Sequence, residues 1–196
     1  MKSIKNLLVI LFALLLSESL LAQKFNTVGI RLIDPMGVTF KHYTTHHKAF
    51  EIGIGTIPDD WLGPYYKGSF ETKDKYEQMW YRESDRDQTL YLFGRLLMQY
   101  PIPVVDLKGS LEWYWGVGAV FKTAEVTYYY STLTTPYEYF VDEVTDIDLG
   151  TDFIGGLEYT FENAPFTVYT ELSLFLEIVD RTHIRALGGI GGRFRF

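Results

Sequence analysis

The sequence predicts an all-β fold, an eight-stranded antiparallel up-and-down transmembrane β-barrel. Three observations predict it. Apolar and polar residues alternate in eight segments of strand length, which gives each segment two chemically different faces. Charged residues and glycines gather on the polar face of these segments. The last alternating segment ends the chain on an aromatic residue, Phe196.

Residues 1–22 have the composition of a cleaved signal peptide. Lys2 and Lys5 give it a positive start, an unbroken apolar run follows at 7–16, and more polar residues complete it. The apolar run is shorter than the ~20 residues that a membrane-spanning helix needs, which disfavours a helical anchor. Cleavage at its end would leave residues 23–196 as a single exported β-barrel domain.

The composition excludes several classes of protein. The 196-residue chain has no cysteine, which excludes a disulfide framework and a lipid anchor on cysteine. Its formal net charge is −7, and this acidic balance disfavours nucleic acid as a partner, since phosphate binding needs a basic surface. Beyond residue 22 no apolar run approaches the length of a membrane helix, so any membrane insertion must be by strands.

The expected strands follow one another along the chain, with turn residues between them. Asp34 and Gly37 mark the turn between the first two strands, and Asn163 and Pro165 mark the turn between the sixth and the seventh. No helix is predicted after residue 22. The eight segments are 27–33, 38–43, 49–56, 89–100, 111–126, 147–161, 166–179 and 186–196.

The fifth segment shows the two faces clearly, with Trp113 and Trp115 on the apolar side and Tyr114 and Gly116 on the other. A lipid-facing Arg or Lys near the middle of a bilayer would cost ~2–4 kcal/mol, so the apolar face is assigned to lipid. The charged residues on the polar face are expected to form a network in the lumen: Arg31, Lys41, Glu51, Arg95, Glu112, Lys122, Asp148, Asp152, Glu158, Glu171, Glu177, Arg193 and Arg195.

Alternation alone also fits a soluble, lipocalin-like barrel with an apolar interior. The positions of glycine distinguish the two. On a solvated sheet surface, glycines would weaken the strands, whereas inside a narrow barrel they make room for large side chains of neighbouring strands. The polar face is therefore assigned to the lumen. The glycines on it are Gly29, Gly53, Gly55, Gly116, Gly118, Gly150, Gly156, Gly189 and Gly191.

The lengths of the links predict an orientation. With both termini in the periplasm, the third and fifth links, residues 57–88 and 127–146, lie at the outer rim, and these are the longest links. Long extracellular loops and short periplasmic turns are typical of outer-membrane barrels. The periplasmic turn expected at 101–110 is longer than this rule suggests.

Several stretches combine alternating strand residues with glycine and turn signals, namely residues 28–37, 39–42, 100–103, 113–118 and 155–159, and the chain ends on Phe196. On these stretches the chain resembles the small eight-stranded outer-membrane β-barrel proteins of the OmpX and OmpA-barrel type, and among them uncharacterised barrel proteins of Bacteroidota. The resemblance spans nearly all of residues 23–196. It implies location in the outer membrane, but no shared catalytic motif and no cofactor.

The resemblance also gives the last strand a role in assembly, because in these barrels the assembly machinery of the outer membrane reads the terminal strand. Within residues 187–196, Phe194 and Phe196 would face lipid as the assembly signal. Arg193 and Arg195 would face the lumen.

The lumen charges allow two interpretations. Basic and acidic residues nearly balance, which fits a lumen plugged by charges that pair with one another. The alternative is a small channel or a solute-binding barrel. The plug is favoured because eight strands leave an interior just wide enough for side chains.

A third alternative is a lipid-modifying enzyme or a protease with its site at the outer rim. Such a site would need a histidine near a serine or an aspartate. His42, His46 and His47 flank a periplasmic turn, and His183 alone falls at an outer link. No catalytic, metal-binding or cofactor-binding residue is therefore assigned.

The two long links carry the candidate binding residues, since aromatic and acidic side chains alternate there. They would suit a protein, a glycan or Ca²⁺, although residues 128–130 would also fit an aromatic girdle at the lipid headgroups. The sequence thus predicts a non-enzymatic outer-membrane barrel with a structural or surface-interaction role. The candidate loop contacts are Asp59, Asp60, Trp61, Tyr65, Tyr66, Trp80, Tyr137 and Tyr139.

Overall fold

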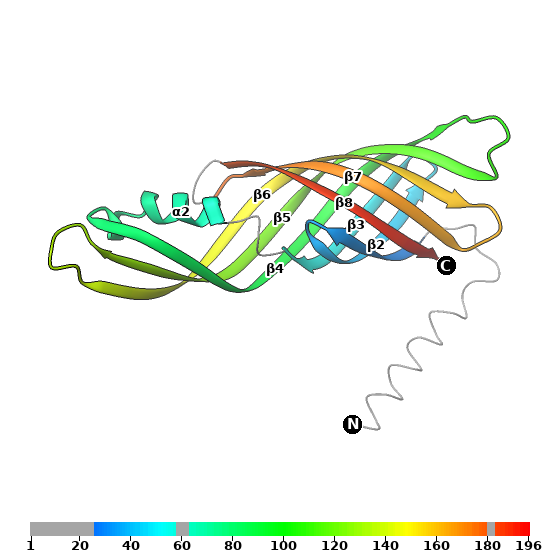
Figure 1. Cartoon of the computed structure of the whole chain (residues 1–196). Helices are drawn as coiled ribbons and strands as arrows, with labels where there is room; N and C mark the ends of the chain where they lie inside the picture. The colour runs from blue at the N-terminus through cyan, green and yellow to red at the C-terminus, as the bar shows by residue number, and fades with distance from the viewer. Residues whose placement is uncertain (1–25, 58–62, 180–182) are drawn as a thin grey trace, which may run out of the picture.

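Eight antiparallel strands close into a barrel within residues 26–57, 63–179 and 183–196, the parts of the chain that the computed structural model describes (Figure 1). The strands follow one another in chain order, and β8 pairs with β1 to close the ring. The predicted all-β, up-and-down barrel is confirmed. The strands are β1 (Asn26–Ile33), β2 (Met36–Thr45), β3 (Lys48–Thr56), β4 (Met79–Ile102), β5 (Gly109–Thr132), β6 (Tyr139–Phe161), β7 (Phe166–Glu177) and β8 (His183–Arg195).

Some sequence predictions fall outside the described residues. These are the signal peptide at 1–22 and the candidate contacts Asp59, Asp60 and Trp61. Among the helices that the structure describes, none is both long and apolar enough to cross a bilayer.

The two rims of the barrel are built differently (Figure 1). The turns after β2, β4 and β6 lie at the rim where the chain ends, called here the C-terminal rim. At the opposite rim, called here the α2 rim, β3 and β7 stop while their neighbours β4 and β6 continue. The continuation, called here the extension, comprises residues 79–90 of β4, 123–132 of β5 and 139–149 of β6.

The extension corrects the expected boundaries of the outer loops. Much of the segments predicted as loops at 57–88 and 127–146 belongs to β4, β5 and β6. Two register irregularities lie within residues 81–89 of β4. A bulge moves the following side chains to the opposite face, so the strand does not show an unbroken period of two in the sequence.

A helical segment contradicts the expectation that no helix follows residue 22. Helix α2 (Gly63–Thr72) and the short 3₁₀ helix η2 (Asp74–Tyr76) lie beside the extension (Figure 1). Two glycines and a proline give α2 a low intrinsic helix propensity. Its aromatic side chains are nevertheless buried: Tyr65, Tyr66 and Phe70 are 7%, 2% and 1% exposed. Tertiary packing therefore stabilises this helix, and local sequence does not reveal it.

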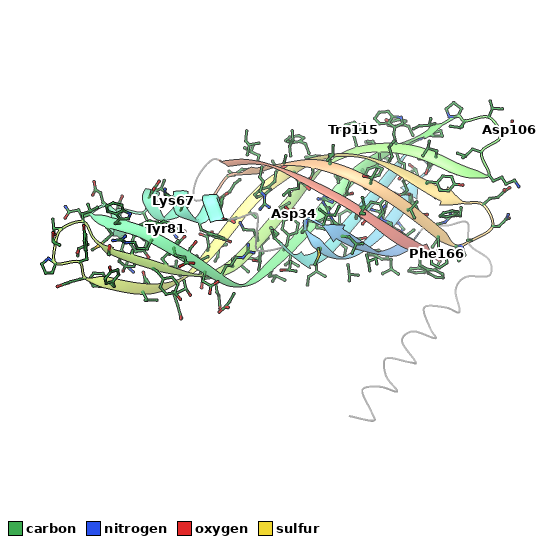
Figure 2. All side chains as sticks on the ribbon, viewed as in Figure 1. Asp34, Lys67, Tyr81, Asp106, Trp115 and Phe166 are labelled. Carbon is green, nitrogen blue, oxygen red and sulfur yellow. The ribbon has the colours of Figure 1, made fainter. Side chains whose placement is uncertain are left out.

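Side chains alternate between the interior and the exterior of the barrel, as predicted. In β1, Val28 and Ile30 are exposed, whereas Thr27 and Arg31 are buried. Outside, apolar side chains form a belt between the two rims, and Figure 2 shows Trp115 on this outer surface. Glu125, within the segment predicted at 111–126, also faces outward, but it lies on the extension and not in the belt.

Interior glycines make room for aromatic rings of neighbouring strands. A Cβ on Gly53 would lie 2.3 Å from the ring of Phe93, and a Cβ on Gly156 would lie 2.5 Å from the ring of Tyr114. Both distances are too short for any side chain, so the rings require glycine opposite them. The glycine-rich, polar face is the interior of the barrel.

Aromatic residues surround the C-terminal rim on the outside. The rings of Tyr100 and Trp113 stack with centroids 5.1 Å apart, and Phe166 meets Phe194 edge-on at 5.6 Å. Figure 2 shows Phe166 at this rim, together with Asp106 in the turn between β4 and β5. Belts of aromatic rings at the edge of an apolar surface are typical of the boundary between lipid and water.

Candidate functional site

Glu158 on β6 is the centre of an ion-pair cluster near the C-terminal rim. Its Oε2 atom lies 2.9 Å from Lys41 Nζ and 2.5 Å from Arg193 Nη1. Arg193 Nη2 also donates to Glu51 Oε1 at 2.6 Å, and the hydroxyl of Tyr43 donates to Glu158 Oε1 at 2.6 Å. The four charged side chains are at most 1% exposed. Charges buried this deeply require partners, and here each has one.

A second cluster fills the middle of the lumen around Glu171 on β7. Arg31 and Arg95 both pair with this carboxylate, and the hydroxyl of Tyr114 donates to its Oε2 atom at 2.8 Å. Arg95 also donates from Nε to Asp152 Oδ2 at 2.7 Å. Each arginine and carboxylate of this cluster comes from a different strand, so the cluster ties opposite walls of the barrel together.

The lumen is closed at the α2 rim by a side chain from the helix. The Tyr65 hydroxyl donates to Asp148 Oδ1 at 2.8 Å and to Glu177 Oε2 at 3.0 Å, and Asp148 also pairs with Lys122. Burial raises the pKa of Tyr65 well above its usual value, so its hydroxyl stays a donor. The cavity beside it, which Arg185 also lines, holds about 10 Å³, roughly the space of one water molecule.

Two predicted members of the lumen network differ from the expectation. Glu112 accepts a hydrogen bond from Gln99 at 2.7 Å but forms no ion pair with any described residue. Arg195 lies at the C-terminal rim and, among the residues that the structure describes, pairs with no carboxylate. Arg193 makes the contacts with acidic residues that were expected of both arginines.

The network also contains uncharged members that sequence reasoning missed. The side chain of Gln99 accepts a hydrogen bond from Lys41 Nζ at 2.8 Å and donates to Glu158 at 3.1 Å, so it bridges the cluster. Tyr43 and Tyr114 supply further donors. All three lie on the polar face of their strands, which was the available signal, but a search restricted to charged residues passes over them.

Aromatic rings fill the space between α2, η2 and the extension. Phe70 stacks on Tyr76 with ring centroids 4.2 Å apart and lies 5.4 Å from Tyr128 and 5.5 Å from Tyr130. Tyr128 is completely buried. The interpretation of Tyr128 and Tyr130 as an aromatic girdle is therefore wrong: these rings form the core of the extension.

The same packing removes two of the candidate loop contacts from the surface. Tyr65 and Tyr66 are buried, because Tyr65 reaches into the lumen and Tyr66 packs edge-on against it with ring centroids 5.2 Å apart. Neither ring is accessible to a partner outside the protein. Both hold α2 on the barrel instead.

Asp142 on β6 fastens η2 to the extension. Lys75 Nζ and the Tyr76 hydroxyl each donate to Asp142 Oδ2 at 2.5 Å. These hydrogen bonds lower the pKa of Asp142, so the carboxylate remains charged and keeps both contacts. The lysine side of this clamp is exposed, whereas Asp142 is partly buried.

The remaining candidate contacts form one exposed cluster on the extension, called here the tip cluster. Trp80, Tyr137 and Tyr139 are 51%, 45% and 72% exposed. The guanidinium of Arg82 lies 5.1, 5.6 and 6.0 Å from the centroids of these three rings. Arg82 also donates from Nε to Ser131 Oγ at 3.2 Å. The tip cluster thus presents aromatic faces and a fixed cation to solvent.

The two predicted assembly residues lie at the C-terminal rim. Phe194 faces outward, where it contacts Phe166, and its strand neighbours are Val28 and Phe166. The backbone N–H of Phe196 donates to the Asn26 carbonyl at 3.1 Å. The chain end therefore takes part in the seam that closes the barrel.

The histidines at the C-terminal rim make structural contacts. His42 Nδ1 lies 2.8 Å from Asn26 Oδ1, and His47 stacks on Tyr100 with ring centroids 5.5 Å apart. Across the described ranges, no three His, Asp or Glu residues are grouped so that they could hold a metal ion.

Comparison with known proteins identifies the architecture. No protein-family model matches the chain, and no curated protein sequence matches it. Among solved structures, the chain is similar to the N-terminal β-barrel domain of Pseudomonas aeruginosa OprF, with a TM-score of 0.53 and 12% sequence identity; the match covers 87% of this chain and 95% of the OprF domain. The chain thus has the fold of a small outer-membrane-type β-barrel.

Proposed function

We propose that this protein is a non-enzymatic barrel of the outer membrane, exported through a signal peptide at residues 1–22, with its C-terminal rim in the periplasm and its extension outside the cell. The observation that carries the proposal is the distribution of polarity, which is the reverse of that in a soluble protein: the exterior is apolar and the interior is charged. Leu96, Leu172 and Ile184 are 64%, 74% and 67% exposed on the exterior, whereas the ion pairs are buried inside. A lipid environment makes such a surface favourable, whereas water makes it unfavourable, and this supports the proposed location.

Cell fractionation tests the location. The protein should remain in the outer-membrane pellet after a carbonate wash, and its gel mobility should change on heating because a folded barrel resists cold detergent. Recovery as a soluble periplasmic protein would contradict the proposal.

The proposed role of the extension is contact with a protein or glycan outside the cell through the tip cluster. Exposed aromatic rings around an arginine are the residue types that dominate binding energies at interfaces.

Surface cross-linking on intact cells tests this role. The double variant Trp80→Ala/Tyr139→Ala should lose a partner that the wild type captures. Tyr129→Ala, which removes an exposed ring of the same sheet outside the tip cluster, should retain it. An unchanged set of partners in the double variant would argue against a contact through this cluster.

The C-terminal strand is proposed as the segment that the barrel assembly machinery reads. Its outward phenylalanines lie at the seam between β8 and β1. Deletion of Phe196 should slow insertion in cells while leaving the stability of barrels that do insert nearly unchanged, as measured by pulse-chase gel mobility and urea unfolding. Normal insertion of the deletion variant would contradict this role.

A further inference from the structure

The belt of apolar side chains on the exterior is interrupted by an open groove. The groove has a volume of about 500 Å³, within the range of small-molecule binding sites. One wall is the row of paired residues Val28, Phe40, Ile52, Gly94 and Ala119, which runs from β1 to β5. The surface is hollowed here because Gly94 and Ala119 stand side by side in this row and project almost nothing from the barrel.

The opposite wall and the floor are apolar as well. Ile54, Leu92 and Phe121 lie in the next row toward the α2 rim and form the second wall. The backbone between the two rows forms the floor. No charged residue lines the groove, and its one polar lining residue, Thr39, is buried on the lumen side of the strand. A polar ligand would find no partner in it.

The direction and length of the groove fit one occupant. Its wall crosses four spacings between neighbouring strands of about 4.8 Å each, so it is about 19 Å long. Barrel strands tilt by about 40°, so a row perpendicular to them rises by roughly 12 Å along the membrane normal. One leaflet of hydrocarbon is about 15 Å thick. The groove therefore has the extent of a single acyl chain in one leaflet.

The position of the groove places it in the leaflet at the C-terminal rim, which is the periplasmic leaflet in the proposed orientation. Its lower end at Val28 is two residues from the start of β1 at the C-terminal rim, and it climbs from there toward β5. On the outward side of β2 and β3, the next row toward this rim is His42 paired with Phe50, and Lys48 follows at the rim, where β3 begins. His42 and Lys48 are both exposed. A cation in this place suits a phosphate group whose acyl chain enters the groove.

We propose that the groove bounded by Phe40, Ile52 and Gly94 binds an acyl chain of a phospholipid whose phosphate is held at Lys48. This inference rests on the proposed membrane location. In lipid, apolar contact alone favours the groove little over the surrounding chains, because lipid tails are as apolar as the side chains. Close packing along the hollow and the charge of Lys48 supply the preference.

Photolabelling in lipid nanodiscs tests the proposal. The full folded barrel is placed in nanodiscs of phosphatidylcholine that contain a trace of phosphatidylglycerol with a diazirine on its acyl chain, and labelled peptides are located by mass spectrometry. Labels should concentrate on the outward residues of β2, β3 and β4 that line the groove. Uniform labelling around the barrel would overturn the proposal.

Two glycine variants form a matched pair. A Cβ at Gly94 meets no atom nearer than 3.9 Å, and a Cβ at Gly155, outside the groove, meets none nearer than 3.8 Å. Both Gly94→Leu and Gly155→Leu should therefore fold. Gly94→Leu fills the hollow and should reduce groove labelling roughly fivefold through lost packing contacts, whereas Gly155→Leu should not change it. Ala119→Leu fills the same hollow from β5 and should repeat the result.

The head group is tested separately. Lys48→Ala should reduce labelling by the phosphatidylglycerol probe about fivefold but leave labelling by a diazirine alkane, which has no phosphate, unchanged. Equal loss with both probes would overturn the role of Lys48.

A dimer in the nanodisc that Gly94→Leu disrupts would identify a second copy of the chain as the occupant. Failure of the wild type to enter nanodiscs would instead refute the proposed membrane location, so the two proposals fail in different ways.

Discussion

At the scale of single residues, the structure separates two arginines that sequence alone treats as equivalent. Both lie on the inward face of β8. Arg193 contacts the carboxylates of Glu51 and Glu158, whereas Arg195 contacts none among the described residues. Removing one partner of a buried ion pair leaves an uncompensated charge, which is more destabilising than the pair itself is stabilising.

Arg193→Ala should therefore lower the free energy of unfolding by about 3–5 kcal/mol, since Glu51 and Glu158 would each lose a buried partner. Arg195→Ala is the matched control, two residues away on the same face of β8. It should lower the free energy of unfolding by no more than ~0.5 kcal/mol. Urea unfolding in detergent micelles, followed by gel mobility and tryptophan fluorescence, measures both. Equal losses would contradict the difference in ion pairing between the two arginines.

At the scale of elements, α2 and η2 are held by contacts of two kinds. Buried rings hold both segments on the extension, since Tyr76 of η2 stacks on Phe70 of α2, and the Asp142 clamp holds η2 in addition. The first kind is independent of pH, whereas the second requires a charged carboxylate. The hydrogen bonds from Lys75 and Tyr76 lower the pKa of Asp142 below its ordinary value of 3.8.

The sign of the pH effect follows from this direction. A group whose pKa is lower in the folded state contributes stability that is fully present above its unfolded pKa and is lost as the pH falls through its folded pKa. Protection of η2 against hydrogen exchange should thus be constant above about pH 4 and decline below it. Asp142→Asn should show weaker protection without this decline. A decline of the same size in Asp142→Asn would place the effect on another group.

At the scale of the whole molecule, the barrel is a closed body with a filled interior. Ion pairs occupy the lumen from Glu158 near one rim to Asp148 near the other, and Tyr65 covers the end. This arrangement favours a structural plug over the alternative of a small channel.

Planar-bilayer recordings should accordingly show no conductance for the wild-type barrel. Tyr65→Ala, which removes the cover at the α2 rim, should also be silent, because the clusters at Glu171 and Glu158 still fill the lumen. Arg95→Ala opens space in the middle cluster and is therefore the more demanding test of the plug. Discrete conductance steps in the wild type would revive the channel alternative.

How far the sequence predicts the site follows from the range of each interaction. The polar faces of the strands already identify Arg31, Lys41 and Glu171 as inward, because alternation is a property of neighbouring residues. The pairing is not predictable in this way. Arg95 and Asp152 are 57 positions apart, and Arg193 and Glu51 are 142 apart, so only strand register and barrel closure decide which charges meet.

By itself, the sequence determined the eight strands, the inward and outward faces, and the need for glycine beside large rings, since each follows from local periodicity and size. Only the tertiary structure decided that β4, β5 and β6 extend beyond their neighbours and that a glycine-containing helix folds against them. It also decided which aromatic residues are buried, namely Tyr65, Tyr66 and Tyr128, and which are exposed, namely Trp80 and Tyr139. The physical reason is that burial of aromatic rings between distant segments overrides weak local propensity. No local pattern records which segment will provide the opposite surface.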